Sequence, residues 1–256
     1  MALTVNTNVF SLAAQKNLTR SSGDLETSIQ RLSSGLRINR AKDDAAGLAI
    51  AQLQTGQARG LTVAQRNIAD GASYLNVADA TLQSVSDMLQ RQRELAVQAA
   101  SGLYTATQVT YMTTEFTALT SEINAAFTRA NFNGAAVFGG GGAIQVGANA
   151  GDTITITANT IAVAGAITSV ASLDTDLNAV AAELANIGAL ESRLDQAATV
   201  AAAMEEAQYA AAGNIMDADF ARETAKMTSA QVIQQAGVAA LAQANSLPQL
   251  ALSLLQ

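Results

Sequence analysis

Apolar residues recur at helical spacing near the start of this chain. Successive apolar residues are seven, four, three and four positions apart; they are Leu18, Leu25, Ile29, Leu32 and Leu36. Such a pattern predicts one helix with a coiled-coil-like apolar stripe. Gly35 suits the left-handed conformation that often ends a helix, so we expect a stop there.

The second and third predicted helices follow after a short connector. Asp43 or Asp44 can cap the second helix, which we expect to run to about Ser101. The third helix is predicted over about 106–130. Its buried face would carry Phe116, Leu119, Ile123 and Phe127.

Helical spacing returns in the last third of the chain. It begins at Leu173 and continues to about Tyr209, and the pair at 213–214, Gly-Asn, predicts a break. A final helix is then expected to end near Leu247 and Pro248, because proline disrupts helical hydrogen bonding.

Residues 131–172 change from helical to extended spacing. Apolar and polar residues alternate around 144–146 and again over 153–157, on either side of a glycine-containing turn. This pattern predicts a β-hairpin at about 143–158. The glycine run at 139–142 lacks the spacing of known phosphate-binding loops, so we do not expect a phosphate site.

Together these elements predict a mainly α fold. Long antiparallel helices would form a coiled-coil-like rod with a small β-hairpin, and the N- and C-terminal helices would pair. We expect a terminal helical assembly domain with its connector, made of residues 1–42 and 214–256, and a helical rod domain over 43–213 that includes the hairpin.

Both ends of the chain are uncharged. Residues 1–15 and 227–256 contain no Asp, Glu, Lys or Arg, although 14% of the chain is charged. Polar side chains interrupt the apolar residues of these ends, which makes a membrane span improbable. We expect the ends to become ordered where neighbouring chains cover them. We therefore predict self-assembly. The residues expected to carry it are Leu18, Leu25, Ile29, Leu32, Val232, Ile233, Leu241, Leu250 and Leu254.

Composition removes most catalytic chemistries. The chain has no cysteine and no histidine, which excludes disulfides, Ser-His and Cys-His catalysis and nearly every transition-metal site. Its net charge of −7 argues against nucleic acid. Residues 173–226 hold ten acidic and three basic groups, so the acidity lies in the C-terminal half. We expect no catalytic residue, metal or cofactor.

Several sequence motifs resemble those of bacterial flagellin. The resemblance is to a minimal form of the family, which has the two core domains and lacks the variable outer region. The motifs occur in the family's order and span essentially the whole chain. They are RLSSGLRINRAKDDAAGLAI at 31–50, RELAVQAA at 93–100, NFNG at 131–134, IQVGAN at 144–149 and QQAGVAALAQANSLPQLALSLLQ at the end.

The resemblance implies a function that composition does not. A flagellin is a structural subunit that is secreted and polymerises with its own copies into the extracellular flagellar filament used for swimming. Its implied partners are the type III flagellar export apparatus, an export chaperone, and the filament cap and hook-junction proteins. We expect no nucleic acid and no membrane insertion.

The resemblance also implies a host contact. In flagellins detected by the vertebrate Toll-like receptor for flagellin, central contacts come from an Arg and a Leu in a QRxRELAV motif and a Glu on the next helix. The matching residues here are Arg91, Leu95 and Glu115. Filament packing or solvated ion pairs would explain the charged residues as well, and exposed pairs contribute little to stability.

Two alternatives share parts of this pattern. A hook–filament junction protein has similar terminal helices. A secreted adhesin or binding protein could use residues 131–172, whose threonines could contact ligands or carry O-linked sugars. The RLSSGLRIN, IQVGAN and SLL segments favour the filament subunit.

Overall fold

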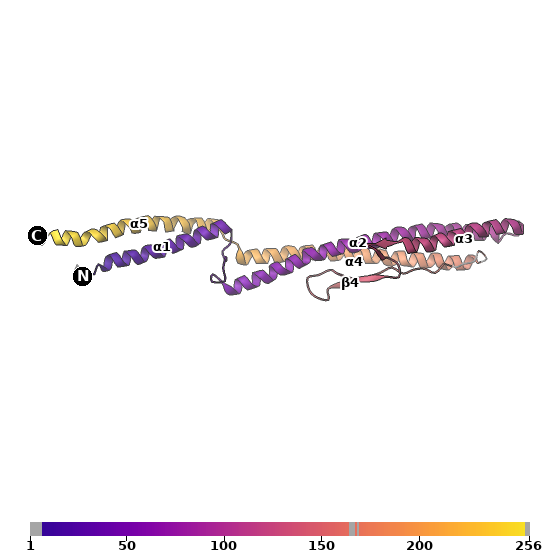
Figure 1. The fold of residues 1–256 in the computed structure, drawn as a ribbon, viewed down its shortest axis with the longest axis horizontal. Helices are drawn as coiled ribbons and strands as arrows, with labels where there is room; N and C mark the ends of the chain where they lie inside the picture. The colour runs from indigo at the N-terminus through magenta and orange to yellow at the C-terminus, as the bar shows by residue number, and fades with distance from the viewer. Residues whose placement is uncertain (1–6, 164–166, 168, 254–256) are drawn as a thin grey trace. The chain divides into compact units, whose positions relative to one another are not determined.

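The computed structural model describes residues 7–163, 167 and 169–253 and is mainly helical, as predicted (Figure 1). The helices are α1 (Val9–Ser34), α2 (Ala45–Ala99), α3 (Ala106–Arg129), α4 (Val170–Met216) and α5 (Phe220–Ser253). The strands are β1 (Asn131–Phe132), β2 (Ala135–Ala136), β3 (Gly141–Gln145) and β4 (Thr153–Thr157).

The chain forms two compact units. The terminal unit consists of Met1–Thr55 and Tyr209–Gln256, and the central unit consists of Gly56–Gln208. The domain limits expected from the sequence, at 42/43 and 213/214, followed the breaks between helices. The limits of the two compact units lie inside α2 and α4.

Local residues define both ends of α1 and the start of α2. Asn8 caps α1 by accepting a hydrogen bond from the backbone N–H of Ser11, and Gly35 ends the helix in the left-handed conformation with φ of 72°. Of the two candidate caps of α2, Asp44 accepts from the N–H of Gly47. Asp43 instead stabilises the connector between α1 and α2, residues 35–44, because its carboxylate accepts hydrogen bonds from the backbone N–H groups of residues 39 and 40.

The break between α4 and α5 lies later than the predicted 213–214. Helical bonding continues there, because the N–H of Asp217 donates to the carbonyl of Gly213. The next N–H, from Ala218, donates to the carbonyl of Gly35 instead. The hydrogen bond to the connector therefore ends α4, whereas the Gly-Asn pair at 213–214 does not interrupt the helix.

The predicted end of the last helix near Leu247 and Pro248 is also wrong. Helix α5 continues to Ser253 with Pro248 inside it. A proline removes one helical hydrogen bond, and a helix tolerates this where the freed carbonyl finds another donor.

The central unit has a core built on a strict seven-residue repeat. Buried positions recur every seven residues on α2, α3 and α4, which is the spacing of coiled-coil packing. These core positions are Ile68, Leu75, Leu82 and Leu89; Phe116 and Ile123; and Leu173, Val180, Ile187 and Leu194.

The predicted β-hairpin forms from β3 and β4, which pair antiparallel with Gln145 opposite Thr153. Ile154 and Ile156 of β4 are buried in the core, and the threonines that alternate with them, at 153, 155 and 157, are exposed. Gly71 on α2 permits this packing, because a Cβ atom there would overlap Cδ1 of Ile144.

A second, two-residue ladder was not predicted. Strands β1 and β2 pair through the turn Asn133–Gly134, where both residues have positive φ, 50° and 79°. This conformation fits a type I′ turn, so the Asn-Gly dipeptide of the NFNG motif was a signal that could have predicted it.

Candidate assembly surface

Helices α1 and α5 pack antiparallel in the terminal unit along a heptad-spaced line, here called the terminal seam. Its buried or half-buried positions alternate by three and four residues on each helix. They are Ser11, Ala14, Leu18, Ser21, Leu25, Ser28 and Leu32 on α1, and Glu223, Met227, Ala230, Gln234, Gly237, Leu241 and Ala244 on α5.

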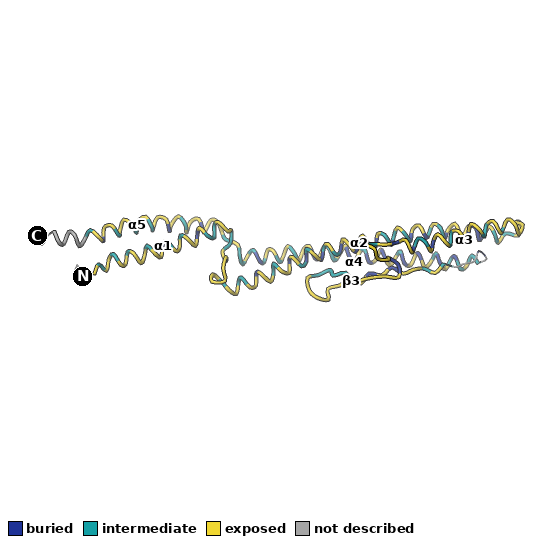
Figure 2. Tube along the Cα trace, in the orientation of Figure 1, coloured by how far each residue is buried: buried dark blue, intermediate teal, exposed yellow. Residues whose placement is uncertain are grey.

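The terminal seam is made largely of small and polar residues. Seven of its fourteen positions are Ser, Ala or Gly. Hydrogen bonds replace part of the missing apolar packing, for example from Ser21 Oγ to the carbonyl of Ala230 at 3.0 Å. Figure 2 shows the contrast with the central unit, where α2 and α4 carry most of the buried positions. Because tertiary burial provides most helix stability in proteins, the α1–α5 pair alone is only weakly stabilised.

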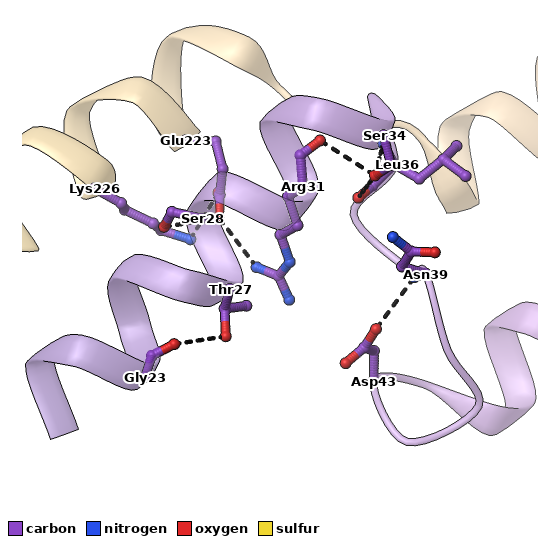
Figure 3. A network of polar contacts seen from close by, with 10 residues as sticks. All are labelled: Gly23, Thr27, Ser28, Arg31, Ser34, Leu36, Asn39, Asp43, Glu223 and Lys226. Carbon is purple, nitrogen blue, oxygen red and sulfur yellow. Dashed lines mark hydrogen bonds and ion pairs between the residues drawn. The ribbon is translucent and has the colours of Figure 1, made fainter. Parts of the chain in front are cut away.

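A polar cluster occupies the connector end of the seam (Figure 3). The Glu223 carboxylate, whose side chain is 8% exposed, accepts from Arg31 and Lys226 at 3.3 Å each and from Ser28 Oγ at 3.4 Å. A buried carboxylate requires such partners, because an unpaired buried charge is strongly destabilising. Sequence reasoning missed Glu223, although the heptad spacing read back from Ala230 along α5 reaches it.

Large apolar side chains lie outside the terminal seam and remain exposed. Each is about half exposed or more in the subunit. They are Val9, Phe10, Leu12 and Ile29 on α1, and Phe220, Val232, Ile233 and Val238 on α5. Exposed apolar side chains gathered on one pair of helices mark an interaction surface.

The predicted assembly residues fall into two groups. Leu18, Leu25, Leu32 and Leu241 lie half-buried on the terminal seam, between the two helices of one subunit. Exposed outside the seam are Ile29, Val232 and Ile233. The side chain of Leu250 and all of Leu254 lie outside the described residues.

Charge is divided unevenly between the two units. The terminal unit holds eight basic and seven acidic residues, whereas the central unit holds six basic and fourteen acidic residues. The net charge of −7 therefore comes from the central unit. Copies of the nearly neutral terminal unit can approach one another with little electrostatic repulsion.

The structure brings together two of the three candidate receptor residues. Arg91 donates from Nε to Glu115 at 2.9 Å and from a second nitrogen to Glu94 at 2.9 Å, and all three side chains are about half exposed or more. The Glu115 carboxylate, and then Glu94, raise the pKa of Arg91 above its ordinary value. Leu95 is only 2% exposed and belongs to the core, so its predicted receptor contact has no support from this geometry.

Metal-binding and membrane-spanning features are absent from the part of the chain that the structure describes. No group of three or more acidic, histidine or cysteine side chains there could hold a metal ion. Within the same described residues, no helix has an apolar stretch that meets the requirements for crossing a membrane.

Comparison with known proteins gives matches along most of the chain. The model of the bacterial flagellin N-terminal helical region matches residues 5–143, and that of the C-terminal helical region matches residues 170–255. Flagellin FlaB2 of Treponema pallidum (strain Nichols) is 35% identical over 287 aligned residues, covering 98% of this chain and 99% of that protein. A flagellin of Xenorhabdus nematophila is 35% identical over 313, covering all of both chains. The crystal structure of Bacillus cereus flagellin aligns with 31% identity and a TM-score of 0.49, covering 53% of this chain and 88% of that one.

Proposed function

This chain belongs to the bacterial flagellin family, and we propose that α1 and α5 together form the surface through which its copies associate. The chain is an extracellular structural subunit that polymerises with other flagellin subunits into the flagellar filament for motility. The alternatives of a hook–filament junction protein or a secreted adhesin are not favoured by these matches.

One observation supports this assignment of the assembly surface to α1 and α5. The α1–α5 pair has small residues at seven of the fourteen positions of the terminal seam and leaves large apolar side chains exposed outside it, in a unit with almost no net charge. Covering those side chains with other copies supplies the apolar burial that the pair lacks in one subunit.

Cysteine labelling tests this surface, since the natural chain contains no cysteine. In Val232→Cys, whose position is 59% exposed, we expect a maleimide dye to react with the monomer and to be excluded from the filament. Thr155→Cys, at an exposed position of β4, is the control and should react in both states. Equal labelling of Val232→Cys in monomer and filament would show that α5 is not covered by assembly.

We expect acid to disassemble the filament. Protonation of the 21 Asp and Glu side chains would leave the positive charge of the 14 Lys and Arg side chains uncompensated, and strongly positive copies repel one another. Sedimentation against pH should show loss of polymer below about pH 5, the range in which carboxylates titrate. A midpoint between about pH 6 and 8 would contradict this, because the chain has no histidine to titrate there.

The contribution of Asp43 to stability should change with pH only at the acid end of that range. The N–H groups of Arg40, and then Asn39, lower the pKa of Asp43 from its ordinary value of 3.8. A carboxyl with a lowered pKa stabilises the folded connector above its ordinary pKa, and this contribution is lost as the pH falls through the lowered value. Because an asparagine oxygen at position 43 can still accept from the N–H groups of Asn39 and Arg40, Asp43→Asn should remove only this acid dependence and leave a midpoint near pH 5 unchanged.

The resemblance to receptor-detected flagellins supports a further proposal, that Arg91 with Glu115 contacts the vertebrate Toll-like receptor for flagellin. Arginine anchors often dominate interfaces, so Arg91→Ala should reduce the response to monomeric protein by about ten-fold or more in a reporter-cell assay. Arg129→Ala, which removes another exposed ion-paired arginine, is the matched control. Equal activity of both variants and the natural protein would remove this proposal.

Leu95→Ala needs a second measurement beside that assay. Because Leu95 is buried, its truncation should lower the stability of the central unit by about 2–5 kcal/mol, whatever it does to receptor contact. Thermal unfolding must accompany the receptor response for this variant.

Further partners rest on family membership. They are the flagellar export apparatus, an export chaperone, and the filament cap and hook-junction proteins. The exposed apolar residues of α5 support a chaperone contact, because they need cover before assembly. We also propose that the chain catalyses no reaction, in keeping with the structural role of its family.

A further inference from the structure

Pro248 lies inside α5 and leaves one carbonyl of that helix without its usual donor. In an α-helix the N–H of each residue donates to the carbonyl four residues earlier. Proline has no N–H, so the carbonyl of Ala244 cannot be satisfied by residue 248. Ala244 is 8% exposed on the terminal seam, where solvent has little access to it.

The missing donor comes from α1. Nδ2 of Asn8 donates to the carbonyl of Ala244 at 2.8 Å, across 236 residues of sequence. The other end of the same side chain, Oδ1, accepts from the N–H of Ser11 at 3.1 Å and so caps α1. One amide thus satisfies an unpaired donor of α1 and an unpaired acceptor of α5, and Ser11 Oγ adds a bond to Asn245 Oδ1 at 2.9 Å.

Such a contact matters because the terminal seam specifies its own register weakly. A shift of one heptad places seam positions on seam positions again, and small residues penalise that shift little. Polar side chains at seam positions are the usual means of fixing register. The Glu223 cluster does so at the connector end, and the Asn8 contact lies at the opposite end of the seam.

We propose that Asn8 is a positioning residue for filament assembly. By occupying the carbonyl that Pro248 leaves free, it fixes α1 on α5 in one register and thereby sets the exposed apolar side chains of both helices in the arrangement that the next copy covers. This inference rests on the proposed role of the α1–α5 surface. It adds a specific function for a proline inside a helix and an asparagine at the start of another.

The test compares two substitutions of Asn8 in two backgrounds. Asn8→Asp keeps the capping oxygen and loses the Nδ2 donor, whereas Asn8→Ala loses both. Each is made in the natural chain and in Pro248→Ala, where residue 248 regains an N–H for the carbonyl of Ala244. The critical concentration for polymerisation is measured for all variants, with helix content from circular dichroism.

In the chain that keeps Pro248 we expect Asn8→Asp to raise the critical concentration about five-fold, the factor that corresponds to the net ~1 kcal/mol of one hydrogen bond. In the Pro248→Ala chain the same substitution should change it less than about two-fold, because the carbonyl is already satisfied. Asn8→Ala should raise it in both backgrounds, since the cap is lost in both. Helix content should not differ between the natural chain and Asn8→Asp.

Three results would overturn the inference. If Asn8→Asp polymerises like the natural chain, Asn8 is only a helix cap. An equal rise in both backgrounds would assign the effect to the added charge and remove any role for Pro248. If filaments form normally in every variant but Val232→Cys stays reactive in them, the α1–α5 surface itself is the wrong assignment and the inference falls with it.

Discussion

A chain that ends at Lys226 is expected to stay soluble and helical and to form no filaments. The deletion removes six of the seven α5 positions of the terminal seam, together with the exposed Val232, Ile233 and Val238. It leaves the whole central unit, whose core lies within 56–208. Assembly should therefore be lost while most of the folded structure remains.

Sedimentation of the truncated and full-length proteins under polymerising conditions measures this effect. Thermal unfolding provides the control, because the main transition, which we assign to the central unit, should occur at nearly the same temperature in both. Long filaments from the truncated chain would show that α5 is not required. Loss of the main transition would show that the central unit depends on the removed segment.

The largest stability effect is expected from Phe116→Ala. Phe116 is 1% exposed at a heptad position of α3, in the core shared with α2 and α4. Truncation of a buried phenylalanine costs about 3–5 kcal/mol, through lost burial and the cavity left behind. Its backbone carbonyl also accepts from the buried Nε2 of Gln92 at 3.1 Å, so collapse around the cavity would strain that bond.

Urea unfolding of the isolated subunit measures the loss. Tyr111→Ala is the matched control, because Tyr111 lies on the same helix and is 70% exposed. The control should change the free energy of unfolding by less than about 1 kcal/mol. A similar small change for Phe116→Ala would mean that the heptad core of the central unit does not provide its stability.

The regular parts of the fold could be predicted because apolar periodicity specifies them locally. Ile68, Leu75, Leu82 and Leu89 indicate α2 by their spacing, and the alternation at 153–157 indicates β4. Gly35 ends α1 as predicted, since its left-handed conformation is a property of that residue in its local context.

The departures from prediction depend on contacts between distant segments. The end of α4 follows from a hydrogen bond between Ala218 and Gly35, and the continuation of α5 past Pro248 places Ala244 where Asn8 supplies a donor. Neither partner can be identified from the local sequence of its helix. The two helix ends that were predicted wrongly, those of α4 and α5, are thus places where the C-terminal part of the chain forms hydrogen bonds with the N-terminal part.

The candidate surface was predictable in location but not in detail. The absence of charge pointed to the ends of the chain, yet a count of apolar residues could not separate Leu18 and Leu25, on the terminal seam, from Ile29 and Val232, outside it. Only the packing of α1 on α5 makes that division. It also reveals serines and a glutamate at positions where apolar residues would be expected.

Limited trypsin digestion of monomer and filament tests most directly whether copies associate through α1 and α5. The helices carry cleavage sites at Lys16, Arg20, Arg31, Arg222 and Lys226. In the monomer we expect these sites to be cut before those within the central unit. The many small residues of the terminal seam hold α1 and α5 together weakly, so that this helix pair opens locally. In the filament the sites should be protected, and mass spectrometry should no longer detect the released peptide 227–256. Equally rapid cleavage of these sites in intact filaments would contradict the account.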